Sequence, residues 1–221
     1  MTALDFLSPS LASEEGGFQP VARSAAERVF AAAGAIFDVR DGWRCPTIVP
    51  DAERHLATVG VADLSHLGKL EVRPSPPAAL PVVDERLQET VAKSAWYRLS
   101  PRRALVLFPE RARAEVAAHF GDANLLLDVT AAYTVLAVSG PGARGLISRL
   151  THLHHFPSGG EVAHVTAHVL PAGRVFPGSS GFRILVAQEL GHYLAEVTLD
   201  RATALGGGLV GVDALPEEER P

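Results

Sequence analysis

The chain has 221 residues, of which 47% are hydrophobic and 20% are charged, and its formal net charge at pH 7 is -5. This size allows one larger domain or two small lobes with a real core. A negative net charge does not indicate a nucleic-acid-binding surface, which would be basic. No apolar run is long enough to span a membrane.

Cys45 is the only cysteine. A single cysteine excludes an internal disulfide and a cysteine metal site, and we expect it to be a small buried hydrophobe. The N-terminus has no basic and then apolar signal peptide. We therefore expect a cytoplasmic protein that does not enter a membrane.

The chain begins with a segment that has no period. Residues 1–22 mix Ser, Pro, Glu and Gly, and we expect a loose N-terminal arm. Ser24 followed by Glu27 then predicts a capped helix over 24–33. At the other end, the acidic and Pro-rich residues 216–221 predict a disordered tail.

Between these ends, strands outnumber helices. Apolar runs between turn residues predict strands over 35–40, 47–49, 68–73, 95–99, 104–108, 125–129, 133–138, 161–170 and 182–187. Helical periodicity predicts three helices, over 110–120, from about Pro141 to Leu150, and over 190–201. Four prolines exclude regular structure over 74–81. Because hairpin signals dominate over long crossovers, the expected class is α+β with mostly antiparallel sheets.

The most informative segment runs from Gly60 to Arg73, and we call it the signature segment. Its polar residues Asp63, Ser65 and His66 lie close together, and Asp and Ser side chains often bond nearby backbone amides to fix a turn. On a strand, Ser65 and His66 would point to opposite faces, so a nucleophile and base pair is not expected. The residues alone leave a structural turn and a functional motif open.

Other polar clusters have simpler explanations. Five histidines invite a zinc site, but no HExxH helix or carboxylate at ligand spacing accompanies them: His152, His154, His155, His164 and His168. On one strand, His164 and His168 would be about 13 Å apart, so we expect surface histidines and no metal. The loop 178–182 is either a hairpin turn or part of a ligand pocket.

Four segments in order resemble one family, the glycine cleavage T-protein (aminomethyltransferase) superfamily. The signature segment resembles its run Gly-Val-x-Asp-x-Ser-His-x-Gly-Lys-x-x-Val, and Gly178 to Val186 resembles its Tyr-Thr-Gly-Glu-x-Gly-Phe-Glu loop and strand. The other two matching segments are 128–144 and 211–215. The resemblance implies an aminomethyltransferase-like, folate-binding-type domain of two intertwined lobes over 23–215.

The departures from the family concern its chemistry. Ser179 stands where T-proteins carry the acid thought to hold the pterin, and the family's Asn-Asp motif and C-terminal barrel have no counterpart. We therefore expect no catalytic residue. What the resemblance implies is a folate-like pocket formed by Asp63, Ser65, Arg174, Phe176, Ser179 and Phe182.

Within the superfamily, the chain most resembles the gamma subunit of heterotetrameric sarcosine oxidase, through segments 96–107 and 153–162. This implies a non-catalytic or folate-binding-like subunit of an amine oxidase complex in one-carbon metabolism, with flavoprotein partner subunits. Tetrahydrofolate is the candidate ligand, and no covalently bound cofactor is expected. Two alternatives stay open: a tetrahydrofolate-dependent aminomethyl- or methyltransferase that uses Asp63 or Asp128, and a stand-alone folate-binding regulator.

Overall fold

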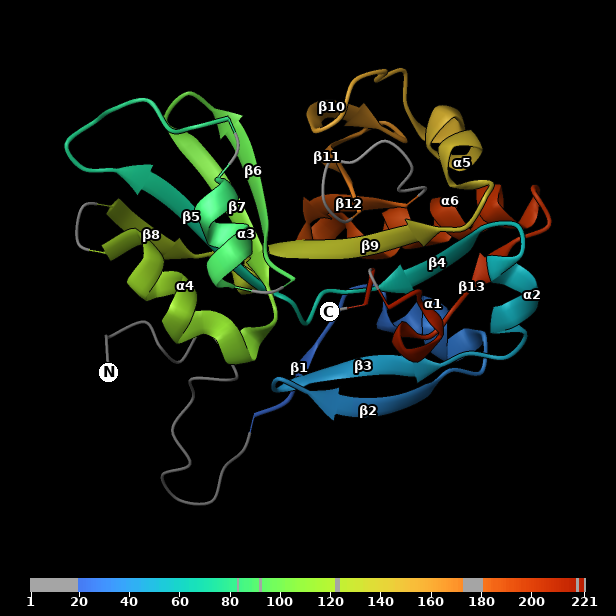
Figure 1. Ribbon diagram of the computed structural model, residues 1–221. Coiled ribbons are helices and arrows are strands. Elements are labelled where there is room, and N and C mark those ends of the chain that lie inside the picture. Colours follow the sequence, from blue (N-terminus) through green and yellow to red (C-terminus); the bar gives the residue numbers. More distant parts are fainter. Residues whose placement is uncertain are drawn as a thin grey trace.

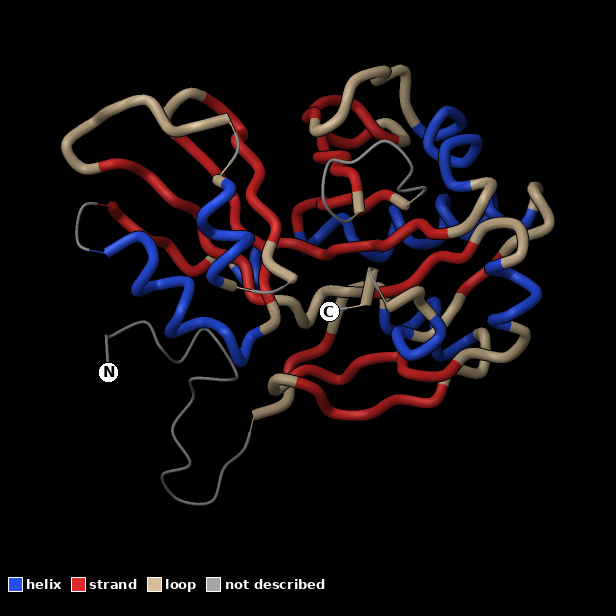
Figure 2. Tube along the Cα trace, in the orientation of Figure 1, coloured by secondary structure: helices blue, strands red, loops and turns tan. Residues whose placement is uncertain are grey.

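The computed structural model describes residues 20–82, 84–91, 93–121, 124–172, 181–217 and 219–220 (Figure 1). Within them, two sheets lie against each other, and helices cover the outer face of each sheet (Figure 2). The fold is mixed α+β with mostly antiparallel sheets, as the sequence predicts. Most of the expected N-terminal arm lies outside the described residues.

The larger sheet has six strands in the order β10-β11-β12-β9-β4-β13. All neighbours are antiparallel except β13 and β4, which are parallel. The strands are β4 (Gly60–Asp63), β9 (Tyr133–Ser139), β10 (Ser158–Val162), β11 (Val165–Pro171), β12 (Phe182–Ala187) and β13 (Gly208–Leu209). Three helices pack on one face: α1 (Glu27–Ala32), α5 (Ala143–Leu150) and α6 (Gly191–Thr203).

The smaller sheet has four strands in the order β6-β7-β5-β8, all antiparallel. These strands are β5 (Gly68–Pro74), β6 (Ala95–Ser100), β7 (Arg103–Phe108) and β8 (Asn124–Asp128). Its outer face is covered by α3 (Glu85–Thr90) and α4 (Arg113–Phe120). The 3-10 turns are η4 (Glu110–Ala112), η6 (Thr130–Ala132), η7 (Gln188–Leu190) and η8 (Val212–Ala214).

A third sheet of three strands has the order β1-β3-β2. Its strands are β1 (Ala22–Arg23), β2 (Ile36–Arg40) and β3 (Trp43–Ile48). The sequence pattern predicted a strand that begins only after Pro46. Strand β3 instead contains Pro46, which lies opposite Phe37 of β2. The central strand tolerates this proline because β1 pairs with Trp43 and Arg44 only, so the missing amide removes no bond to β1.

The two main sheets share a buried apolar layer. Tyr97, Leu105 and Leu107 of the four-stranded sheet pack in one cluster with Ala137 and Leu185 of the six-stranded sheet. Burial of this kind stabilises by about 25 cal/mol per Å² of apolar surface. The layer therefore fixes the two sheets relative to each other, and Leu64 and Leu67, which lie where the chain crosses between the sheets, belong to the same cluster.

Several element boundaries differ from the expected ones. The first helix begins at Glu27, three residues after its predicted start at Ser24. Ser24 Oγ accepts a hydrogen bond from the Ala26 amide just before the helix. Two short helices were not predicted: α2 (Ala52–Leu56), which packs on β4 and β13, and α3. The irregular stretch over 75–81 and the hairpin of β6 and β7 are confirmed.

The predicted single strand over 161–170 is wrong, because the chain turns inside it. Residues Ser158–Val162 and Val165–Pro171 form a hairpin, and both turn residues have positive φ, 48° at Ala163 and 66° at His164. A two-residue turn with both φ values positive matches the twist of a hairpin. His164 thus lies in an exposed turn and His168 on β11, so the two were wrongly placed on one strand.

The C-terminal residues pack against the rest of the molecule. Glu219 is buried, and Arg220 donates from Nη2 to the carbonyl oxygens of Asp213 and Leu215, each over 2.8 Å. Within the expected tail, Glu219 and Arg220 are thus in contact with the fold. No helix among the described residues is long and apolar enough to cross a membrane.

Candidate functional site

The signature segment lies where the chain passes from one main sheet to the other. Strand β4 ends at Asp63 in the six-stranded sheet, and β5 begins at Gly68 in the four-stranded sheet. Residues 64–67 make this crossing. The chain returns through residues 129–132, between β8 and β9. The Leu64 amide donates to the Val135 carbonyl over 2.8 Å, which ties the first crossing to the strand that follows the second.

Asp63 and Ser65 form a closed local turn. The Ser65 amide and hydroxyl both donate to Asp63 Oδ1, over 2.9 and 2.6 Å. Ser65 Oγ in turn accepts from the Val135 amide over 3.1 Å and from the Ser24 hydroxyl over 3.2 Å. The Ser65 hydroxyl is therefore fully used in holding three segments together.

Asp63 has a buried carboxyl group, and one of its two oxygens has no hydrogen-bond partner among the described residues. Its side chain is 1% exposed, and that oxygen is Oδ2. Burial raises the pKa of Asp63, against the lowering effect of the Ser24 hydroxyl nearby, of the Ser65 bonds and of the Lys69 charge. A group so enclosed cannot meet a substrate without movement of its surroundings.

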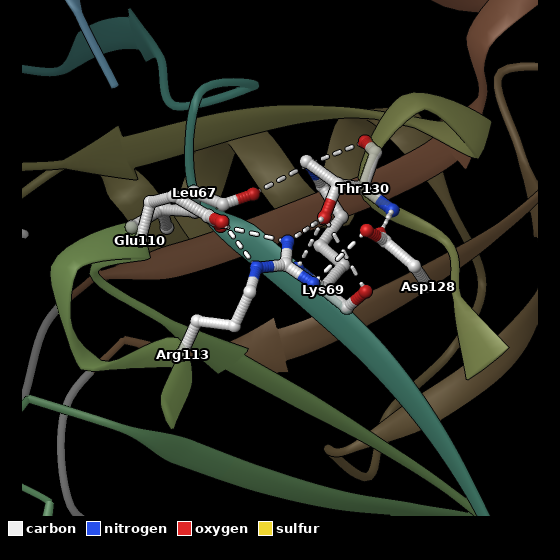
Figure 3. Close-up of polar contacts among 6 residues, drawn as sticks. All are labelled: Leu67, Lys69, Glu110, Arg113, Asp128 and Thr130. Atoms are coloured by element: carbon white, nitrogen blue, oxygen red, sulfur yellow. Dashed lines mark hydrogen bonds and ion pairs between the residues drawn. The ribbon is translucent and has the colours of Figure 1, made fainter. Parts of the chain in front are cut away.

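Lys69 is the centre of the site (Figure 3). It is fully buried, and its ammonium donates to the backbone carbonyls of Ser65, Leu67 and Thr130, over 2.9, 2.8 and 2.8 Å. An ammonium has three donors and no acceptor, so all its hydrogen-bonding capacity is used. Ser65 and Leu67 belong to the first crossing and Thr130 to the second, so Lys69 joins the two crossings.

Burial lowers the pKa of Lys69 to about 7, although Asp63, Asp128 and Glu110 oppose this shift. The ring of Trp43 lies beside the ammonium, with 5.8 Å between Nζ and the ring centroid. The Lys69 amide also donates to Thr130 Oγ1 over 3.0 Å. Lys69 is thus bonded to the second crossing through both backbone and side chain.

Beside Lys69, Arg113 connects two acids (Figure 3). It donates from Nη2 to Glu110 Oε2 over 2.9 Å and pairs through Nη1 with Asp128 Oδ2, also over 2.9 Å. Asp128 Oδ1 accepts from the Thr130 amide over 2.9 Å. Burial lowers the pKa of Arg113, but Glu110 and Asp128 together raise it by more than burial lowers it. The net shift of the Arg113 pKa is therefore upward. Asp128 therefore holds a turn and an ion pair.

His66 is buried and neutral. Burial, with the Lys69 and Arg40 charges, lowers its pKa to about 3, and its Nδ1 has no partner among the described residues. Residues 64–67 form a turn between β4 and β5, which is the structural turn that the sequence offered as one of two interpretations of this segment. The Ser65 hydroxyl donates to Asp63 instead of to a histidine.

The expected folate-like pocket is only partly described. Asp63 and Ser65 are bonded to each other within the local turn. Phe182 lies on β12, separated from Asp63 by strand β9, and its ring packs edge-on against Phe156 with 5.2 Å between centroids. The other three residues of the predicted pocket lie outside the described part of the chain: Arg174, Phe176 and Ser179.

Sequence reasoning gave Thr130 and Ser24 no place in the site, and it included Lys69 in the signature segment without a role of its own. One signal was present for Lys69, because the chain has only two lysines and one of them lies in the signature segment. The described residues contain no group of three or more His, Cys, Asp or Glu side chains that could hold a metal ion. Cys45 is buried as expected, and burial raises the pKa of its thiol to about 12.

The solved structures with a similar fold include an aminomethyltransferase and a chain of a sarcosine oxidase. Glycine cleavage system aminomethyltransferase T from Bartonella henselae superposes with a TM-score of 0.62 and 22% identity, over 88% of this chain and 60% of that chain. A chain of heterotetrameric sarcosine oxidase from Corynebacterium sp. U-96, solved in complex with pyrrole 2-carboxylate, gives a TM-score of 0.55 and 15% identity. That match covers 85% of this chain and 97% of the other.

These matches confirm the expected resemblance at the level of the fold. No protein-family model matches the sequence, and no curated protein matches it. The chain spans about three fifths of the length of the aminomethyltransferase. It spans nearly the whole of the matched sarcosine oxidase chain.

Proposed function

We propose that this chain is a non-catalytic subunit of an amine oxidase complex of the sarcosine oxidase type. The observation that carries the proposal is the use of Lys69. All three of its ammonium donors bond backbone carbonyls of the two crossings. The Lys69 ammonium therefore stabilises the fold and has no donor left to bind a substrate.

The two carboxylates considered for transferase chemistry are engaged in the same way. A general base must reach the proton that it removes. Asp63 is buried behind its own turn, and Asp128 is bonded to Arg113 and to the Thr130 amide. These contacts favour the non-catalytic role over the aminomethyl- or methyltransferase alternative.

The proposed setting includes partner subunits. The matched sarcosine oxidase is a heterotetramer, and the match covers 97% of one of its chains. By this analogy we propose flavoprotein partners in the cytoplasm, with the present chain packed among them. Fold analogy alone does not carry function, so the partners are the point to test. A reduced folate is the ligand to test on the chain itself.

The test is purification at the native expression level. The chain is tagged at its chromosomal position and isolated from its own cell extract, and the co-purifying chains are identified by mass spectrometry. We expect a stoichiometric complex that has a flavin absorption spectrum and produces peroxide when sarcosine is added. A stable chain that emerges alone would contradict the proposal.

Calorimetric titration with tetrahydrofolate separates the folate alternatives. Binding to the isolated chain without any partner complex would favour the stand-alone regulator. Aminomethyl transfer by the isolated chain, lost in Asp63→Asn or Asp128→Asn, would establish the transferase. Neither result is expected for a packing subunit.

A further inference from the structure

The C-terminal segment brings Glu219 to a buried position beside the start of β12. Glu219 is 4% exposed, and both of its carboxylate oxygens occupy the space that a side chain at Gly181 would fill. Gly181 directly precedes β12 and extends its pairing, because the Ala172 amide donates to the Gly181 carbonyl over 2.9 Å.

This acid is held in place by a compact turn. The amides of Glu219 and Arg220 both donate to the Pro216 carbonyl over 2.9 Å. The Arg220 guanidinium bonds the carbonyls of Asp213 and Leu215, each over 2.8 Å. Four bonds therefore fix the segment that presents Glu219, although the sequence predicts a disordered tail there.

The same face of β12 carries a buried arginine. Residues 181, 183 and 185 alternate along the strand and share one face, and Leu185 packs there in a cluster with Tyr97 of β6. Arg183 is 5% exposed, and its Nε has no hydrogen-bond partner among the described residues. The Tyr97 hydroxyl donates to the Pro171 carbonyl over 3.1 Å, and burial raises its pKa while the nearby Arg183 charge opposes this shift.

A buried guanidinium is costly unless an anion accompanies it. Its planar fork of donors matches a carboxylate in particular. None of the ion pairs among the described residues lies on Arg183. The carboxylate of Glu219 lies at Gly181, two residues before Arg183 on the same face of β12.

We propose that the space between the start of β12 and Tyr97 of β6 is a carboxylate-binding site, which Glu219 closes from within the chain. A free carboxylate ligand competes with Glu219 for this space and displaces the C-terminal segment. Arg183 supplies the cationic donors and Tyr97 a neutral hydroxyl. The proposal stands on these contacts alone and does not depend on the oxidase role.

The test titrates the full-length chain with glutarate by calorimetry, with uncharged glutaramide as the ligand control. In Glu219→Gln the competing charge is removed, and we expect glutarate to bind at least tenfold more tightly than to the wild type. Glu217→Gln is the matched control, because Glu217 is exposed in the same segment. It should bind glutarate like the wild type. Adding Arg183→Lys to Glu219→Gln should remove the gain.

Equal glutarate affinity of the wild type and Glu219→Gln would overturn the proposal, and so would equally tight binding of glutaramide. A second measurement needs no variant. In the wild type, a saturating glutarate concentration should speed amide hydrogen exchange of the C-terminal peptide by severalfold. Unchanged exchange of this peptide would also overturn the proposal, whether or not a variant folds.

Discussion

The Lys69 ammonium donates to the Thr130 carbonyl over 2.8 Å, and this bond joins the two segments in which the chain crosses between its main sheets. The other two acceptors of the ammonium, Ser65 and Leu67, lie in the first crossing. One side chain thus replaces backbone pairing where neither sheet continues. The signature segment is explained by this requirement, since a turn and a long cationic side chain are both needed there.

The first prediction concerns the loss of this side chain. Lys69→Met keeps the length of the side chain but leaves three buried carbonyls without their donor. Unsatisfied buried groups cost about 1–3 kcal/mol each, although solvation of the relaxed site reduces the sum. We expect the free energy of unfolding to fall by about 3–5 kcal/mol, measured by urea denaturation.

The control is the only other lysine. Lys93 is exposed, so Lys93→Met should change the free energy of unfolding by no more than about 0.5 kcal/mol. A Lys69→Met chain as stable as Lys93→Met would mean that the crossings are held mainly by the apolar layer.

The second prediction is acid sensitivity that depends on His66. Its folded-state pKa is about 3 and its ordinary value is 6.5. Below pH 6.5 the unfolded chain binds a proton that the folded chain does not, so stability falls as the pH drops from 6.5 towards 3. The slope is at most about 1.4 kcal/mol per pH unit.

His66→Gln cannot take up this proton. Urea denaturation at several pH values should therefore give a shallower decline below pH 6.5 in His66→Gln than in the wild type. Other titrating groups, such as the upshifted Asp63, are common to both chains and cancel in the comparison. Parallel pH profiles would show that His66 is protonated in the folded state.

The local part of the site could be predicted from the sequence, and the long-range part could not. Asp63 and Ser65 are two residues apart, so their turn follows from side-chain chemistry alone. Lys69 and Thr130 are 61 residues apart, and their contact depends on how the two crossings run side by side. Periodicity carries no information about such a pairing.

The same distinction applies to the fold. Strands β5, β6 and β7 were predicted because alternation and turn residues coincide there. The β10–β11 hairpin was missed because Ala163 and His164 are not the residues that a turn with two positive φ values favours. Helices α2 and α3 were missed because five- and six-residue helices span less than two turns and give little periodic signal.

The third prediction follows from this turn. Replacing Ala163-His164 by Asn-Gly supplies residues that tolerate positive φ at lower cost. We expect an increase in the free energy of unfolding of about 1 kcal/mol, measured by thermal denaturation. The Tyr193 hydroxyl donates to the Ala163 backbone carbonyl over 2.9 Å, and this bond survives the exchange. A loss of stability would imply that the native side chains contribute contacts of their own.

The fourth prediction contrasts two glycines that sequence reasoning cannot tell apart. Gly145 lies inside α5, is exposed, and has nothing within 4 Å of the place where a Cβ would be. A helix-interior glycine costs about 1 kcal/mol relative to alanine, so Gly145→Ala should raise the free energy of unfolding by that amount. At Gly207 a Cβ would collide with the Val59 backbone carbonyl.

The Gly207→Ala chain must therefore move β13 away from β4. That strand is held by the Gly208 amide, which donates to the same Val59 carbonyl over 3.1 Å. Forcing a methyl group into such a contact costs about 1–3 kcal/mol, and the loss of the bond adds to it. In thermal denaturation, the melting temperature of Gly145→Ala should be higher than that of the wild type, and that of Gly207→Ala should be lower. If both variants shifted in the same direction, the close approach of β13 to β4 would have to be abandoned.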